Sequence, residues 1–283
     1  MGSSLFRRAR RIAIGAVLLA LTASTSVGAI AAEVPSQRPA GALHTGALRF
    51  GYKAFTGGWV DVRPGTSNWG SVHCPPGTSP SGGGGHVDNN SMFMLTSDPV
   101  METGAWVVQF VNTSPNTWGR FYPVVLCTNG ESYAHKVESW VNPNQETTMT
   151  SWCAPGERQS GGGFDSWSTE VRINDAFSVN DVTQQVRVTN ETGWQPEVDT
   201  WVVCGRDNYI VRTASITLQA QESNWVRAYC PNGWVPTGGG GRGGQYTYLQ
   251  HSEPAASGWE VRSKNTGRFP ATLTAQVICA VPR

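Results

Sequence analysis

Hydrophobic residues occur along the chain in short runs, rich in valine and tryptophan, which polar turn residues separate. Residues 59–62, 107–112 and 123–127 are examples of such runs. Runs of this length and composition, bounded by glycine, proline or asparagine, are typical of β-strands. No stretch of helical length keeps an apolar period of about 3.6 residues. The pattern therefore predicts an all-β protein.

The same order of predicted strands recurs three times around one short phrase. In each copy a cysteine is followed by two residues and a glycine, and a glycine run starts eight residues after the cysteine. The three phrases begin at Cys74, Cys153 and Cys230, and such regular spacing indicates internal repeats. The predicted repeats are residues 49–128, 129–206 and 207–283.

Each repeat contains two cysteines, and no Cys-x-x-Cys motif suggests a metal site. Because equivalent units should fold alike, the possible pairings reduce to one disulfide within each repeat. Each bridge would close a loop of about 50 residues, which the chain-entropy model values at roughly 4 kcal/mol. The predicted pairs are Cys74 with Cys127, Cys153 with Cys204, and Cys230 with Cys279.

Two arrangements of the repeats fit this pattern. In the first, three disulfide-stapled, sandwich-like modules pack against one another, and this is the arrangement that we expect. In the alternative, three sheets close around a pseudo-threefold axis as a β-prism with a shared core. We expect the glycine runs to be structural, because glycine allows another strand to approach closely.

The last strand of each repeat lets the buried face be assigned. Two residues before the cysteine all three copies have valine, on the side of the disulfide, so we expect this position to lie in the core. Three residues before the cysteine the copies differ, so we expect that position to be exposed or at a contact between repeats. The differing residues are Val124, Trp201 and Gln276.

Most of the 12 tryptophans recur at equivalent positions. We expect these matched aromatic residues in the core, where large rings fill small β units. Trp152, one residue before its cysteine, is expected to be half-buried. The matched sets are Trp59 with Trp140, Trp69 with Trp225, Trp106 with Trp259, and Trp118 with Trp194 and Phe269.

Three tryptophans have no aromatic counterpart in the other copies, so the fold does without them there. They are better candidates for contact with a ligand, and Trp234 is the strongest because it is close in sequence to Arg242 and to a cluster of aromatic residues. The predicted ligand-binding residues are Trp234, Arg242, Tyr246, Trp167 and Trp201.

The first 31 residues have an arginine cluster, an apolar run and small residues, which together predict a signal peptide. Residues 32–48 lack periodicity and are predicted to form a flexible leader. General and twin-arginine export both fit. Without residues 1–31 the chain keeps 17 basic and 20 acidic residues, a net charge of 17 − 20 = −3. This argues against nucleic acid as a partner, and no later run reaches the roughly 18 apolar residues of a membrane helix. We expect a secreted, extracellular protein.

Catalytic motifs are absent from the sequence: it has no Gly-x-Ser-x-Gly, no His-Glu-x-x-His and no unpaired cysteine to act as a nucleophile. We therefore expect no enzyme activity, metal or cofactor. A carboxylate pair for glycoside hydrolysis could come from distant strands without leaving a motif. The acids available for one in the second repeat, which we expect to be surface residues, are Asp165, Glu170, Asp175, Glu197 and Asp199.

The Cys-Pro-x-Gly turn, the Gly-Gly-Gly run and the closing residues 277–280 resemble a group of exported bacterial proteins common in actinomycetes. A more distant similarity is to the three-repeat β-prism of vitelline membrane outer layer proteins. The second copy departs from the pattern with Ala154 and only three glycines. These motifs imply a fold and carry no catalytic residue.

We expect an exported recognition protein that is lectin-like and binds glycan through weak multivalent sites on the three repeats. The alternative is an adaptor or assembly subunit of an exported complex, such as a toxin particle, which holds a partner chain at strand edges. A protease inhibitor or a toxin is a further alternative. The partner is therefore a glycan or another exported protein, and the oligomeric state stays open.

Overall fold

The computed structural model describes residues 51–282, which contain nineteen strands and no helix. The predicted signal peptide and leader lie outside these residues. The first repeat contains β1 (Tyr52–Thr56), β2 (Val60–Val62), β3 (Ser67–His73), β4 (Ser79–Val87), β5 (Met92–Val100), β6 (Ala105–Asn112) and β7 (Gly119–Thr128). The second contains β8 (Tyr133–Trp140), β9 (Glu146–Trp152), β10 (Arg158–Ser166), β11 (Val171–Ser178), β12 (Thr183–Asn190) and β13 (Glu197–Gly205). The third contains β14 (Tyr209–Leu218), β15 (Ser223–Tyr229), β16 (Val235–Arg242), β17 (Thr247–Ala255), β18 (Gly258–Asn265) and β19 (Ala271–Ala280).

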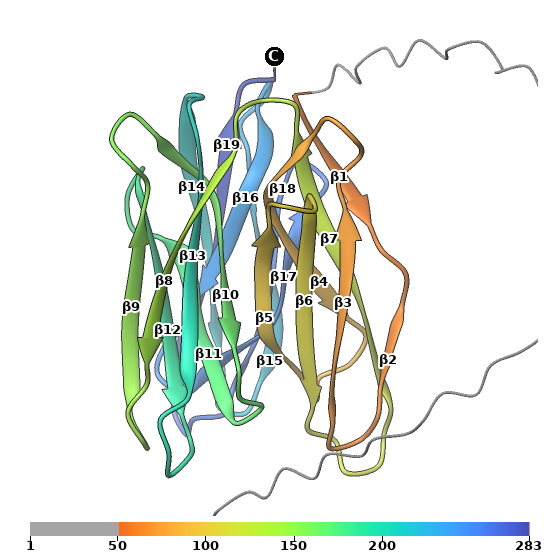
Figure 1. Ribbon diagram of the computed structural model, residues 1–283. Coiled ribbons are helices and arrows are strands. Elements are labelled where there is room, and N and C mark those ends of the chain that lie inside the picture. Colours follow the sequence, from red (N-terminus) through yellow and green to blue (C-terminus); the bar gives the residue numbers. More distant parts are fainter. Residues whose placement is uncertain (1–50, 283) are drawn as a thin grey trace, which may run out of the picture. The chain divides into compact units, whose positions relative to one another are not determined.

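Each repeat folds as two leaves of antiparallel strands. In the first repeat β1, β2, β7 and β4 form one leaf, and β3, β6 and β5 form the other (Figure 1). The predicted disulfides are present and join the two leaves, since Cys74 directly follows β3 and Cys127 lies in β7. The other two bridges are Cys153–Cys204 and Cys230–Cys279.

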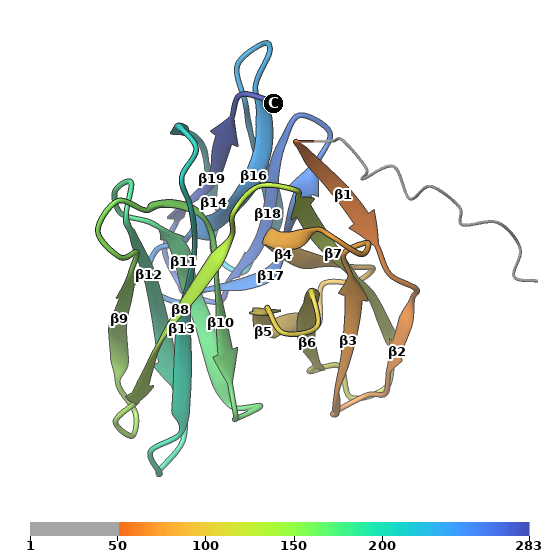
Figure 2. The ribbon, with the colours of Figure 1, turned by 45° about the horizontal axis from the view of Figure 1, so that its top comes forward.

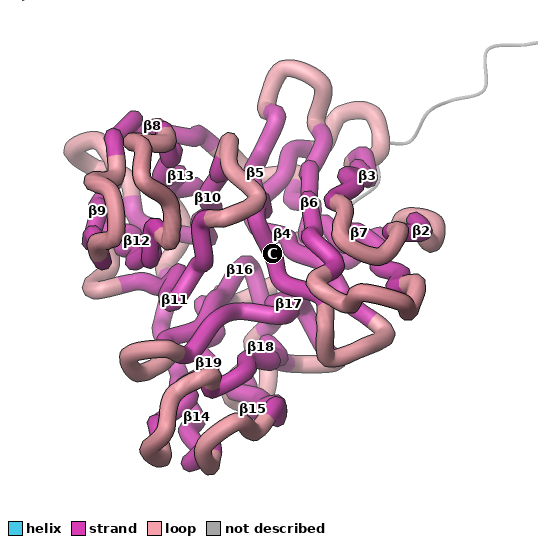
Figure 3. Tube along the Cα trace, turned by 90° about the horizontal axis from the view of Figure 1, so that it is seen from below, coloured by secondary structure: helices cyan, strands magenta, loops and turns pink. Residues whose placement is uncertain are grey.

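Leaves of different repeats pair edge to edge, so every sheet spans two repeats. Sheet I, of order β3-β6-β5-β10-β13-β8, joins the first and second repeats. Sheet II, β14-β19-β16-β11-β12-β9, joins the second and third, and sheet III, β1-β7-β4-β17-β18-β15 with β2 beside β7, joins the first and third. Figures 2 and 3 show the three repeats as lobes around a common centre. The all-β fold of three packed, sandwich-like repeats is confirmed, and the sheets join the repeats in a pseudo-threefold arrangement.

The glycine runs lie in β4, β10 and β16, which meet at the centre. A Cβ atom on Gly82 would lie 2.8 Å from the Cα atom of Gly238, so only glycine fits where these strands touch. Hydroxyl groups beside the glycines form a closed ring of hydrogen bonds to carbonyl oxygens. Ser81 donates to Thr237 over 2.9 Å, Thr237 to Ser160 over 2.8 Å and Ser160 to Ser81 over 3.3 Å.

One cluster of buried apolar side chains includes residues of all three repeats. Of the matched aromatic residues, Trp106 and Trp259 lie in it, and their indole groups donate to Ser97 and Ser252. The expected valines two residues before each cysteine are also fully buried. Three residues before the cysteine, Gln276 is buried and exchanges hydrogen bonds with the backbone of Ser178, which makes that position a contact between repeats.

The core assignment is wrong for the other matched aromatic residues, which are at least half exposed. For those that lie in strands the physical reason is alternation, because an aromatic residue that recurs at one strand position can belong to the outward face in every copy. Four others lie in the connections that precede β2, β7, β13 and β19, outside the packed strands, namely Trp59, Trp118, Trp194 and Phe269. Trp69 lies an odd number of residues from the buried Val72 on β3 and points away from it. The exposed residues are Trp59, Trp69, Trp118, Trp140, Trp194, Trp225 and Phe269, and Trp152, expected to be half-buried, joins them.

Candidate functional site

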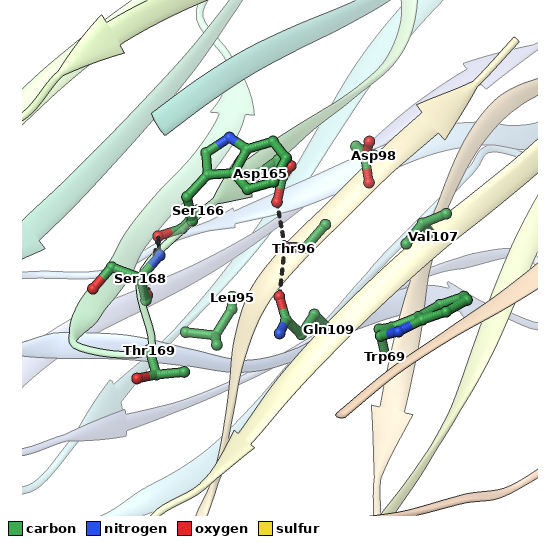
Figure 4. Close-up of a pocket in the computed structure, with 11 residues that line it drawn as sticks. Trp69, Leu95, Thr96, Asp98, Val107, Gln109, Asp165, Ser166, Ser168 and Thr169 are labelled. Atoms are coloured by element: carbon green, nitrogen blue, oxygen red, sulfur yellow. Dashed lines mark hydrogen bonds between the residues drawn. The ribbon is translucent and has the colours of Figure 1, made fainter. Parts of the chain in front are cut away.

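A groove crosses the outward face of sheet I where the first and second repeats meet (Figure 4). Its volume is about 330 Å³. The junction under it is narrow, because β5 and β10 share the single bridged pair Ser97–Phe164. The lining residues are Trp69, Leu95, Thr96, Asp98, Val107, Gln109, Asp165, Ser166, Trp167, Ser168 and Thr169.

Strand register sets the polar floor of the groove. Gln109 on β6 lies opposite Thr96 on β5, and the Thr96 hydroxyl donates to Asp165 Oδ1 on β10 over 2.5 Å. Asp165 in turn lies opposite Asp199 on β13. Asp98 follows two residues after Thr96 on the same face of β5. A row of hydrogen-bonding groups therefore continues from the first repeat into the second.

Two tryptophan side chains border this floor. Trp69, on the edge strand β3, is 63% exposed, and Trp167, in the loop between β10 and β11, is 70% exposed. Trp167 was a predicted binding residue, whereas Trp69 was assigned to the core. Its position on the strand, out of phase with Val72, was the signal that could have identified it as a surface residue.

Three acidic residues in or beside the groove are not fully exposed. Asp98 and Asp165 are partly buried, and Asp199 is buried. Burial, with the nearby Asp165 and Asp199, raises the pKa of Asp98 to about 8. Burial also raises the pKa values of Asp165 and Asp199, against the opposing effect of Thr96 on the first and Lys136 on the second. The Asp98 Oδ1 and Asp199 Oδ1 atoms have no hydrogen-bond partner among residues 51–282.

The expectation that the second-repeat acids lie on the surface is therefore wrong for three of them. Asp175 is 1% exposed, Asp199 is 4% exposed and Asp165 is partly buried. For Asp165 and Asp175 the reason is the pairing of leaves from different repeats, because Asp165 contacts Thr96 of the first repeat and Asp175 lies opposite Arg242 of the third. Asp199 lies between β10 and β8 of its own repeat. The register between strands of different repeats cannot be deduced from a single sequence.

The remaining predicted residues do not gather at this groove. Trp201 on β13 lines a neighbouring depression with His135, and Lys136 Nζ lies 5.6 Å from its ring centroid. Trp234 is partly buried against the core, just before β16 begins. Arg242 is at the far end of β16, which separates it from Trp234.

Tyr246, exposed in the loop between β16 and β17, lines a different pocket with Arg268 and Phe269. Arg242 contributes to neither pocket's lining and lies over the ring of Phe177, 5.2 Å from its centroid. Residues that are close in sequence here are thus far apart in space, because an extended strand carries the chain about 3.3 Å per residue.

Protein-family models and curated proteins were compared with the chain, and none of them matches it. The described residues also contain no helix that could cross a membrane. Three disulfides are typical of proteins that mature in an oxidising environment.

Proposed function

We propose that this protein is an exported, non-catalytic recognition protein that binds a glycan in the groove of sheet I. One observation carries the proposal: the Asp98 carboxyl group has an oxygen without a partner in the described chain, in a groove that two exposed tryptophans border. A buried polar atom without a partner costs free energy unless a ligand or water satisfies it.

The chemistry of the groove suits a sugar. Flat aromatic faces such as those of Trp69 and Trp167 offer apolar area to the C–H face of a pyranose ring. With a pKa of about 8, Asp98 keeps its proton near neutral pH and can donate a hydrogen bond to a hydroxyl group. Gln109 and Asp165 add an amide and a carboxyl group beside it. Because acids form much of the floor, a neutral or amino sugar fits better than a sulfated one.

The test is to screen the mature protein on a glycan array and to measure the best ligand by calorimetry. We expect Trp69→Ala and Trp167→Ala each to weaken binding at least tenfold. Trp225→Ala is the matched control, because Trp225 occupies the position of Trp69 in the third repeat and is also more than half exposed. Absence of binding to every glycan, or an equal loss with Trp225→Ala, would overturn the proposal.

The adaptor hypothesis gives a different outcome in the same system. Affinity purification from culture supernatant would then recover a partner protein in stoichiometric amount, and Trp69→Ala with Trp167→Ala would leave that recovery unchanged. Recovery of glycan alone, lost in both variants, supports the recognition function that we propose.

A further inference from the structure

We propose a binding site for Zn²⁺ or a similar borderline transition-metal ion between His86, His251 and Glu253, on sheet III. Each of these residues offers one ligand atom, and the three atoms lie within 4.8 Å of one another. His86 is on β4 of the first repeat, and the other two are on β17 of the third. The two strands touch at the bridged pair Ser252–Gly85, which places the three side chains on one face beside it.

His251 carries the strongest evidence. Its side chain is 2% exposed, and its Nε2 atom lies 3.1 Å from Glu260 Oε1. The other ring nitrogen, Nδ1, is buried and has no hydrogen-bond partner within the described part of the chain. Histidines that bind metals commonly donate their second nitrogen to a carboxylate, which fixes the tautomer and leaves the first nitrogen free to bind. Arg227 holds Glu260 in turn, over 2.5 Å.

His86 and Glu253 complete the ligand set. His86 Nδ1 lies 2.6 Å from Glu253 Oε1, so a metal ion would take the place of the proton between them. The His86 ring stacks on Tyr122 at 5.0 Å and on His251 at 4.9 Å between centroids. Its side chain is 31% exposed, which gives it room to turn toward an ion and leaves a fourth coordination position open to solvent.

The other two groupings of possible ligands in the described chain are weaker. The group of His135, Glu157 and Cys204 lacks a thiolate, because Cys204 is in a disulfide. The second group consists only of acids, Glu138, Glu197 and Asp199, two of which already pair with Lys136. The His86 site also has a structural consequence, because an ion there would tie the first repeat to the third.

The test uses the metal alone on the mature, metal-depleted protein. We expect calorimetry to find one Zn²⁺ per chain and the thermal midpoint to rise on its addition. Co²⁺ bound in the same site would give a visible d–d absorption band whose intensity is typical of four-coordinate Co²⁺. Glu253→Gln and His86→Gln should each weaken Zn²⁺ binding at least tenfold and abolish the thermal shift, whereas His135→Gln should leave both unchanged.

Circular dichroism checks that each variant is folded, and His86→Gln keeps the test valid if Glu253→Gln fails that check, since His86 is partly exposed. The proposal is overturned if the folded wild-type protein binds no Zn²⁺ at millimolar concentration. It is equally overturned if both variants bind as wild type does, or if His135→Gln weakens binding as much.

Discussion

Sheets I and II have equivalent strand positions on their outward faces, but different polar residues occupy these positions in the two sheets. Where sheet I has Gln109, three residues before a shared asparagine, sheet II has Arg187. Arg187 donates two hydrogen bonds to Asp175, of 2.7 and 3.0 Å, and a third to Glu146. The charges of Arg187 and Asp175 are therefore paired within the chain.

Sheet I has no ion pair at the positions equivalent to Arg187 and Asp175. Thr96 stands where Asp175 is, and Asp165 where Arg242 is, by register and by spacing from the glycine run. Asp98 takes the place of Phe177, over which Arg242 lies. One backbone thus supports a saturated ion-pair network in one sheet and an open acidic groove in another, which indicates that the groove is not needed to build the fold.

The largest expected effect comes from giving sheet II the groove residue. Arg187→Gln leaves Asp175 buried without its cation, and breaking a buried ion pair from one side costs about 3 kcal/mol of unfolding free energy or more. Denaturant unfolding measures this. Arg158→Gln, which breaks an exposed pair with Asp181, should change stability by less than about 1 kcal/mol. Equal losses in the two variants would mean that the networks do not differ in the way described.

A second effect concerns pH. The folded chain holds the Asp98 proton up to about pH 8, whereas an unfolded aspartate loses it near pH 4, so the Asp98 contribution to the unfolding free energy falls as the pH rises between these values. Between pH 5 and 7 we expect this residue to account for a decline of about 3 kcal/mol. Asp98→Asn should flatten the profile, and the exposed control Asp61→Asn should not. An unchanged slope in Asp98→Asn would contradict the assignment.

The smallest expected effect is on binding. Gln109→Arg brings the arginine of sheet II to the groove, where its guanidinium would lie toward Asp165 and compete with a ligand for that carboxylate. We expect glycan affinity to fall about tenfold, roughly 1.4 kcal/mol, with stability unchanged or raised. Gln109→Ala, which leaves the groove open, should lose only a few-fold. If Gln109→Arg binds as wild type does in calorimetry, the ligand does not use this floor.

Much of the fold follows from the sequence, and the reasons are local. The spacing of the cysteines predicts the repeats and their disulfides, and the recurring valine before the second cysteine predicts a buried face. The recurring tryptophans misled because recurrence identifies a position and not a face. On β3, the odd separation of Trp69 from Val72 contained the missing information.

The candidate site was less predictable because it depends on contacts between repeats. Trp167 was found as an unmatched aromatic residue. Asp98 and Asp165 belong to different repeats and come together only where β5 meets β10. Nothing in either strand's own pattern specifies that neighbour.

The ring of hydroxyl groups around the glycine strands has a consequence for how such a chain could have arisen. Each repeat donates one hydrogen bond of this ring to a second repeat and accepts one from the third. Each repeat also contributes its two leaves to two different sheets. A single repeat can meet none of these requirements by itself, but three identical copies could meet all of them. The same geometry would hold together a homotrimer of separate single-repeat chains, from which a fused chain of this kind could arise.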